Sequence, residues 1–115
     1  MNIPEVTVQK LALKMKKGEK FVILDVREGW EIDLAQITDE RAILLPMSRI
    51  AREQKEAFPP ALRDPQTEIV VICHHGIRSA DVTGWMRQNG WKKVFSLAGG
   101  IAAYAEQVDP SVGMY

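Results

Sequence analysis

The sequence predicts an α/β fold, a single domain with a mostly parallel central sheet and helices on both faces. Short apolar runs of the kind that form buried strands alternate with segments whose apolar residues recur at helical spacing. The 115 residues, of which 46% are hydrophobic, suffice for one buried core but not for two domains. We therefore expect residues 1–115 to form one domain.

The N-terminal part of the chain is expected to supply one helix and one strand. Thr7 is a suitable N-cap for a helix over residues 8–17, because its hydroxyl accepts a hydrogen bond from a free backbone amide of the first turn. Gly18 then ends that helix. The uninterrupted apolar run 21–24 predicts a strand that is covered on both faces.

The next segment carries weaker signals. A short helix is expected around residues 30–34. The apolar run 42–45 predicts a second buried strand, which Pro46 ends. Ser48 is expected to cap a polar helix that stops before the proline pair at 59–60.

The C-terminal half repeats the alternation of strands and helices. Residues 69–72 form the clearest strand, because four β-favouring apolar residues stand between charged and loop residues. A helix over 79–89 follows, and then a strand over 94–97. The glycine pair at 99–100 opens a last helix over about 101–107.

Charge and cysteine content narrow the class of function. Lys and Arg together number 15, as do Asp and Glu, so the net charge is zero. A partner nucleic acid held mainly through its phosphates is therefore not expected. The N-terminus lacks the pattern of a secretory signal, no apolar run is long enough for a membrane span, and a single thiol suits a reducing compartment. We expect a cytoplasmic protein with neither a nucleic-acid nor a membrane partner.

Sites in parallel sheets form at the carboxyl ends of strands, and two segments lie there. Asp25 and Arg27 follow the strand at 21–24; an ordinary ion pair at a strand end is an equally good interpretation of these two residues. The second segment follows the strand at 69–72 and leads into the next helix. It consists of Cys73, His74, His75, Gly76, Ile77, Arg78 and Ser79.

The second segment is the candidate active-site loop. Lone cysteines are usually inert core residues, but the polar residues after Cys73 argue against that interpretation here. Amides at a helix N-terminus stabilise an anion, so a thiolate at Cys73 becomes a competent nucleophile. Gly76 allows a positive φ that turns amides inward, Arg78 adds a cation, and Ser79 is expected to cap the helix.

The two histidines of the loop are a poor set of zinc ligands, because structural zinc usually takes four well-spaced ligands. We expect no metal. Instead, His74 and His75 are expected to line the mouth of the site and to add partial positive charge.

The loop resembles that of the rhodanese family, which reads Cys-x-x-Gly-x-Arg and is often followed by Ser. The resemblance covers nearly the whole chain. It includes an Asp-x-Arg stretch followed by acidic residues, the second strand, a Gly–aromatic pair and a Leu-x-Gly-Gly signature, and the last residues resemble small bacterial members and domains fused to adenylyltransferases. These segments are 24–31, 42–46, 90–91, 97–101 and 108–115. One departure is Ala35-Gln36-Ile37, where the family usually has Gly-His-Ile.

The resemblance implies a thiosulfate sulfurtransferase of rhodanese type. Cys73 would take sulfane sulfur from a small donor such as thiosulfate, hold it as a persulfide among the loop amides, and pass it to a thiophilic acceptor such as cyanide, a thiol or a protein. The pair formed by Asp25 and Arg27 would lie beneath the loop and help to fix it. No cofactor is implied.

Two other classes remain open. Cysteine-dependent phosphatases and arsenate reductases have Cys-x5-Arg, whereas this loop has Cys-x4-Arg, a tighter cradle that better suits one sulfur atom. A binding module or sulfur carrier without turnover is the other alternative. Its partner would be a protein in a sulfur relay, with thiosulfate only a laboratory donor.

Overall fold

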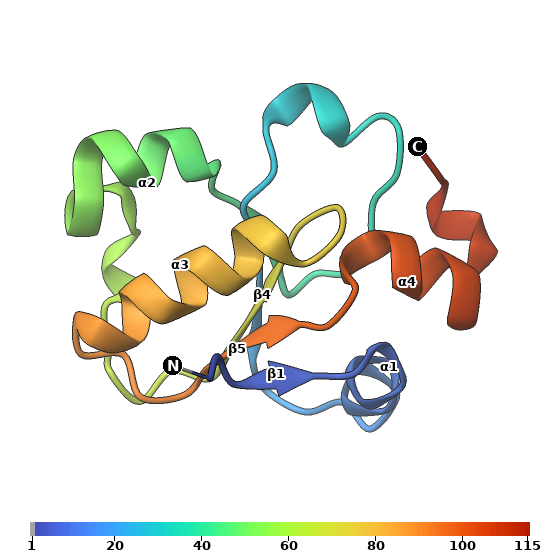
Figure 1. Ribbon diagram of the computed structural model, residues 1–115. Coiled ribbons are helices and arrows are strands. Elements are labelled where there is room, and N and C mark those ends of the chain that lie inside the picture. The colour runs from blue at the N-terminus through green and yellow to red at the C-terminus, as the bar shows by residue number, and fades with distance from the viewer. Residues whose placement is uncertain (1) are drawn as a thin grey trace.

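The computed structural model describes residues 2–115 and contains one five-stranded, fully parallel sheet in the order β1-β5-β4-β2-β3. Helices cover both faces of this sheet (Figure 1), so the predicted fold class is confirmed. The strands are β1 (Glu5–Val6), β2 (Val22–Asp25), β3 (Ala42–Leu44), β4 (Ile69–Ile72) and β5 (Val94–Leu97).

The four α-helices divide into two layers. α1 (Val8–Lys16) and α4 (Gly100–Gln107) pack on one face of the sheet, and α2 (Met47–Glu53) and α3 (Ile77–Gln88) pack on the other (Figure 1). Short 3₁₀ turns complete the chain at Gly29–Glu31, Gln54–Ala57, Pro60–Leu62 and Pro110–Val112. None of the helices within residues 2–115 has the length and apolar character needed to cross a membrane.

Each layer buries its own apolar core against the central strands. β4 is buried at all four positions, which explains its uninterrupted apolar sequence. One core contains Leu24, Val71 and Met86, and the other contains Leu11, Ile23 and Ile101. Neighbouring residues of β2 thus point to opposite cores, as the period of two residues in a strand requires.

Most expected elements are present, with small shifts of their ends. The Thr7 hydroxyl accepts a hydrogen bond from the amide of Lys10 at 3.1 Å, so this N-cap is confirmed. The strands expected at 69–72 and 94–97 have those bounds. The two-residue strand β1 was not predicted, because its pairing with β5 involves too few residues to leave a periodic signal.

Three local predictions are wrong. β3 is an edge strand with Leu44 44% exposed, and not a buried one, because only β2 pairs with it. Ser48 does not cap α2, which begins after Pro46; its hydroxyl donates to Glu28 instead. The helix expected from residue 79 begins at Ile77, and its N-cap is Gly76, not Ser79.

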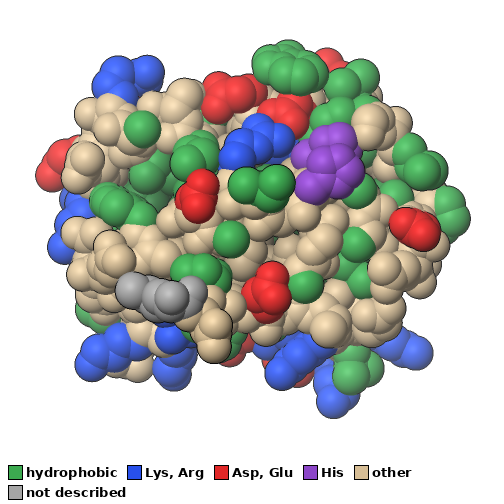
Figure 2. Space-filling view, viewed as in Figure 1, with side chains coloured by type: hydrophobic (Ala, Val, Ile, Leu, Met, Phe, Trp, Pro, Cys, Tyr) green, Lys and Arg blue, Asp and Glu red, His purple; other side chains and the backbone are tan. Residues whose placement is uncertain are grey.

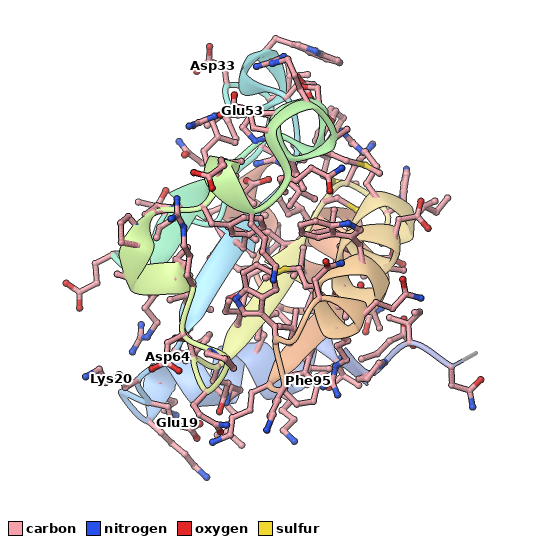
Figure 3. All side chains as sticks on the ribbon, turned by 90° about the vertical axis from the view of Figure 1, so that its left-hand side faces the viewer. Glu19, Lys20, Asp33, Glu53, Asp64 and Phe95 are labelled. Atoms are coloured by element: carbon pink, nitrogen blue, oxygen red, sulfur yellow. The ribbon has the colours of Figure 1, made fainter. Side chains whose placement is uncertain are left out.

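Charged residues lie at both ends of the sheet. Figure 3 places Asp33 and Glu53 at one end and Glu19, Lys20 and Asp64 at the other. The first end is the one at which the parallel strands finish, so it is where a site is expected.

Candidate active site

Cys73 lies at the carboxyl end of β4 and is only 1% exposed. The chain leaves the strand at this residue, turns through His74 and His75, and enters α3 after Gly76. Gly76 adopts φ +97°, a left-handed conformation that other residues rarely take. A side chain there would also press against the Gly99 amide at 3.2 Å, so both the turn and the packing require glycine.

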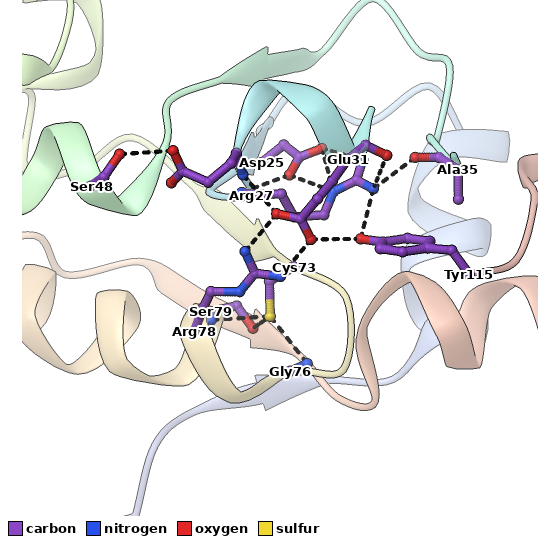
Figure 4. Close-up of polar contacts among 11 residues, drawn as sticks. Asp25, Arg27, Glu31, Ala35, Ser48, Cys73, Gly76, Arg78, Ser79 and Tyr115 are labelled. Atoms are coloured by element: carbon purple, nitrogen blue, oxygen red, sulfur yellow. Dashed lines mark hydrogen bonds and ion pairs between the residues drawn. The ribbon is translucent and has the colours of Figure 1, made fainter. Parts of the chain in front are cut away.

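The Cys73 sulfur is surrounded by hydrogen-bond donors (Figure 4). The amide of Gly76 lies 3.1 Å from Sγ, and the amide of Ser79 lies 3.3 Å from it. The Ser79 hydroxyl lies 3.4 Å away and accepts a hydrogen bond from the thiol. Ser79 therefore lies inside the first turn of α3 and contacts the sulfur directly. Amides at a helix N-terminus that point at one atom favour negative charge on that atom.

The opposite side of the loop is held by α4. The amide of Ile101 donates to the carbonyl of Cys73 at 2.9 Å, and the amide of Ala102 donates to the carbonyl of His74 at 3.0 Å. This approach requires Gly100, because a Cβ there would lie 2.6 Å from the carbonyl oxygen of Cys73. The glycine pair at 99–100 thus lets α4 bind the carbonyls of the loop, while the amides of Gly76 and Ser79 point at the sulfur.

Arg78 does not stand as an isolated cation. Its two terminal nitrogens each lie 2.7 Å from a carboxylate oxygen of Glu31 (Figure 4). The Arg78 hydrogen bonds lower the pKa of Glu31 to about 2, and the same bonds raise the pKa of Arg78. Glu31 was noted in the sequence only as an acidic residue after Arg27. No local signal indicated that it would reach α3.

Asp25 and Arg27 form a buried pair at the end of β2. The Asp25 carboxylate accepts from Nη2 of Arg27 at 2.8 Å and from its Nε at 3.0 Å. Arg27 is 0% exposed, and its remaining nitrogen donates to the carbonyl of Ala35 at 2.7 Å. Burial opposes the charge of Arg27, but the hydrogen bond to Asp25 raises its pKa.

Tyr115, which the sequence did not single out as a site residue, joins these two ion pairs. Its hydroxyl donates to Glu31 at 2.9 Å and accepts from Nη1 of Arg27 at 3.1 Å. Its ring stacks on His74 with a centroid distance of 3.8 Å and an angle of 9°. Burial raises the pKa of Tyr115, so the hydroxyl keeps its proton and remains a donor at neutral pH.

The two histidines of the loop differ in their surroundings. Burial, and then the nearby His75, lower the pKa of His74, which disfavours its charged form. His75 is exposed, and its ring lies 3.8 Å from that of His74. Within residues 2–115, no three His, Cys, Asp or Glu side chains are grouped closely enough to hold a metal ion.

The rim of the site is mixed in character. Ile77 is 74% exposed beside the loop, and Trp30 is 70% exposed in the turn that carries Glu31. Figure 2 shows the two histidines as one patch, with basic, acidic and hydrophobic side chains around it. The site therefore combines a buried sulfur with an exposed, partly apolar rim.

The sequence model of the rhodanese-like domain family matches residues 7–107. The rhodanese-like/PpiC domain-containing protein 12, chloroplastic, of Arabidopsis thaliana is 29% identical across 98% of this chain. The probable adenylyltransferase/sulfurtransferase MoeZ of Mycobacterium tuberculosis is 32% identical across 96%. The chain spans 38% and 26% of these two proteins. A crystal structure of a rhodanese-related protein from Thermoplasma volcanium has TM-score 0.73 and 28% identity, covering 91% of this chain and 93% of that one.

Proposed function

The chain belongs to the rhodanese-like domain family, and from that premise we propose that it is a sulfurtransferase that carries sulfane sulfur as a persulfide on Cys73. The observation that carries the proposal is the set of donors around the sulfur. The amides of Gly76 and Ser79 donate to Sγ from 3.1 and 3.3 Å, and the Ser79 hydroxyl, 3.4 Å away, can turn to donate to an anionic sulfur. These groups match an anionic sulfur, while the carbonyls of Cys73 and His74 bind amides of α4 instead.

The reaction divides into two displacements. In the first, the Cys73 thiolate attacks the outer sulfur of a donor such as thiosulfate; a new S–S bond forms, the donor's S–S bond breaks, and sulfite leaves with the electron pair. In the second, a nucleophilic acceptor attacks the outer sulfur of the persulfide and regenerates the thiolate. Neither step requires an oxidant or a cofactor.

The remaining residues of the site act by positioning. Gly76 and Ser79 supply the amides, and the Arg78–Glu31 pair fixes the first turn of α3 against the turn after β2. The Asp25–Arg27 pair supports Glu31 from beneath through Tyr115. His74 and Ile77 border the approach to the sulfur.

A sulfur relay to a protein is the natural extension of this proposal. One of the relatives carries both adenylyltransferase and sulfurtransferase in its name, and the present chain matches about a quarter of its length. In that version, the acceptor is a protein thiol or another protein nucleophile, and thiosulfate substitutes for a physiological donor. The exposed apolar rim at Trp30 and Ile77 suits a protein acceptor better than a small anion.

Intact-protein mass spectrometry tests the proposal. After incubation with thiosulfate, the protein should gain the mass of one sulfur atom, and cyanide should remove it. Cys73→Ser is nearly isosteric and should fold normally but gain nothing. If no sulfane donor loads the wild-type protein, or if Cys73→Ser loads equally well, the proposal is wrong. Hydrolysis of an aryl phosphate that depends on Cys73 would favour a phosphatase instead.

A further inference from the structure

Two buried hydroxyl groups connect the sulfur of Cys73 to the interior of the sheet. Oγ of Ser79 lies 3.4 Å from Cys73 Sγ and 2.8 Å from Oγ of Ser96. Both serines are 0% exposed. Ser96 belongs to β5 and pairs with residues of β4 and β1, so the sheet fixes its position from both sides. The resulting series is Cys73 Sγ, Ser79 Oγ and Ser96 Oγ.

The number of hydrogen atoms in this series depends on the state of the sulfur. Among residues 2–115, Ser79 is the one hydrogen-bond partner of the Ser96 hydroxyl, so the series has two contacts, and each takes one hydrogen. A thiol brings three hydrogens to those contacts, one S–H and two O–H, and one hydrogen lacks an acceptor. A thiolate leaves two hydrogens, and both are used.

In the thiolate state, the direction of donation is defined. Ser96 donates to Ser79, and Ser79 donates to the sulfur. A buried donor without an acceptor is unfavourable, whereas a hydrogen bond to a charged acceptor is stronger than one between neutral groups. Both effects favour the deprotonated sulfur, and the series is longer and more polarised than a single hydroxyl.

We propose that Ser96 is a positioning residue for the sulfur chemistry, acting through the Ser79 hydroxyl to favour the thiolate of Cys73. The same count applies to a persulfide, whose inner sulfur carries no hydrogen; that half of the proposal rests on the proposed function. Ser96 lies in a different element from the loop and outside its sequence motif, so the motif alone does not indicate it.

Other charged and titratable groups lie around the loop, and none of them contacts the Ser96 hydroxyl. They are Arg78 with its partner Glu31 from α3 and the turn after β2, His74 and His75 from the loop, the Asp25–Arg27 pair from β2, and Tyr115. A change seen on removing the Ser96 hydroxyl therefore reports the hydroxyl series and not a change in these charges.

The test is the pH dependence of Cys73 alkylation by iodoacetamide, together with the ultraviolet absorbance of the thiolate. Ser96→Ala should move the midpoint of the profile to higher pH by about half to one pH unit, since one supporting hydrogen bond is lost. Ser96→Thr keeps the hydroxyl and should retain the wild-type profile. Thr83→Val is the matched control, because the buried Thr83 hydroxyl has no partner within residues 2–115.

A double-mutant comparison tests the route of the effect. If Ser96 acts through Ser79, Ser96→Ala should cause no further change in a Ser79→Ala background. An unchanged midpoint in Ser96→Ala, an equal shift in both backgrounds, or a shifted profile in Ser96→Thr would overturn the proposal. Alkylation requires no sulfur donor. A Ser96 effect without persulfide loading would therefore contradict the proposed function alone, and loading with an unchanged profile would contradict only the role of Ser96.

Discussion

Arg78 and Glu31 form a two-pronged ion pair, with both nitrogen–oxygen distances at 2.7 Å, between the first turn of α3 and the turn after β2. The Glu31 side chain is 4% exposed and that of Arg78 is 33% exposed. The active-site loop leads directly into α3, so this pair fixes the loop relative to the neighbouring strand. Its strength should appear both in stability and in the geometry of the site.

Removing the charge of Glu31 should destabilise the protein in a pH-dependent way. The pKa of Glu31 falls from its ordinary 4.5 to about 2 in the folded state, so its contribution is complete above pH 4.5 and is lost as the pH falls toward 2. Glu31→Gln should therefore lower the free energy of unfolding by about 2 kcal/mol at pH 7, and by much less near pH 2. Urea unfolding at both pH values measures the difference.

A surface pair provides the control for that measurement. Glu53 pairs with Arg49 at 3.2 Å in α2, and both side chains are partly exposed. Glu53→Gln should change the unfolding free energy by less than about 0.5 kcal/mol at pH 7. Equal effects of the two substitutions would mean that the Arg78–Glu31 pair behaves as an ordinary surface contact.

Gly100→Ala adds only one methyl group but should strongly disrupt the active-site loop. Gly100 has φ +65°, and a Cβ there would lie 2.6 Å from the carbonyl oxygen of Cys73. We expect a loss of about 3 kcal/mol or more in the free energy of unfolding, together with loss of persulfide loading. Thermal unfolding and mass spectrometry after thiosulfate treatment measure the two effects.

Gly18→Ala separates the backbone cost from the steric clash. Gly18 has a similar φ of +70°, but no atom lies within 4 Å of a Cβ placed there. It should cost only about 1 kcal/mol and leave loading unchanged. If Gly100→Ala resembles Gly18→Ala in both measurements, α4 does not hold the loop in the way described.

Asp25→Asn should be severely destabilising. Arg27 is fully buried, and removing the charge of Asp25 leaves an uncompensated cation in the interior. The expected loss is about 3–5 kcal/mol in urea unfolding. Asp39→Asn is the control. Asp39 also pairs with the arginine two residues further along the chain, Arg41, at 2.9 Å, but this pair retains access to water. A smaller loss for Asp25→Asn than for Asp39→Asn would contradict this account.

Tyr115 offers two separable interactions. Tyr115→Phe keeps the ring on His74 but removes the hydroxyl between Arg27 and Glu31, and should cost about 1 kcal/mol in thermal unfolding. Tyr115→Ala also uncovers His74, whose pKa should rise toward its ordinary value because burial is what lowers it. Titration of the His74 ring by NMR follows that change. An unmoved His74 pKa in Tyr115→Ala would show that the stacking does not protect the ring.

The sequence was sufficient to predict the fold class and the central strands. β4 and β5 have the bounds expected from their apolar runs, since burial on both faces demands such runs. The start of α3 was misplaced because serine is a usual N-cap, whereas here Gly76 takes that position and frees Ser79 to contact the sulfur. β3 was misjudged because an edge strand of apolar residues has the same sequence pattern as a buried one.

The candidate site, too, could be predicted from the sequence only in part. The loop from Cys73 to Ser79 is continuous in sequence, so its composition and position reveal it. Glu31, Ser96 and Tyr115 join it from three other elements, at separations along the chain for which periodicity carries no information. Arg78 was expected as a cation of the loop, but its partner Glu31 lies 47 residues away and could not be assigned from the sequence.

The hydrogen bonds from Ile101 and Ala102 to the loop carbonyls have a consequence for folding. The loop around Cys73 precedes α4 in the chain but depends on that helix for its shape. In a partly folded chain whose α4 has not yet docked, the carbonyls of Cys73 and His74 lack these partners. The thiol should therefore be most open to oxidation during refolding before α4 packs on the sheet, and protected once it has packed.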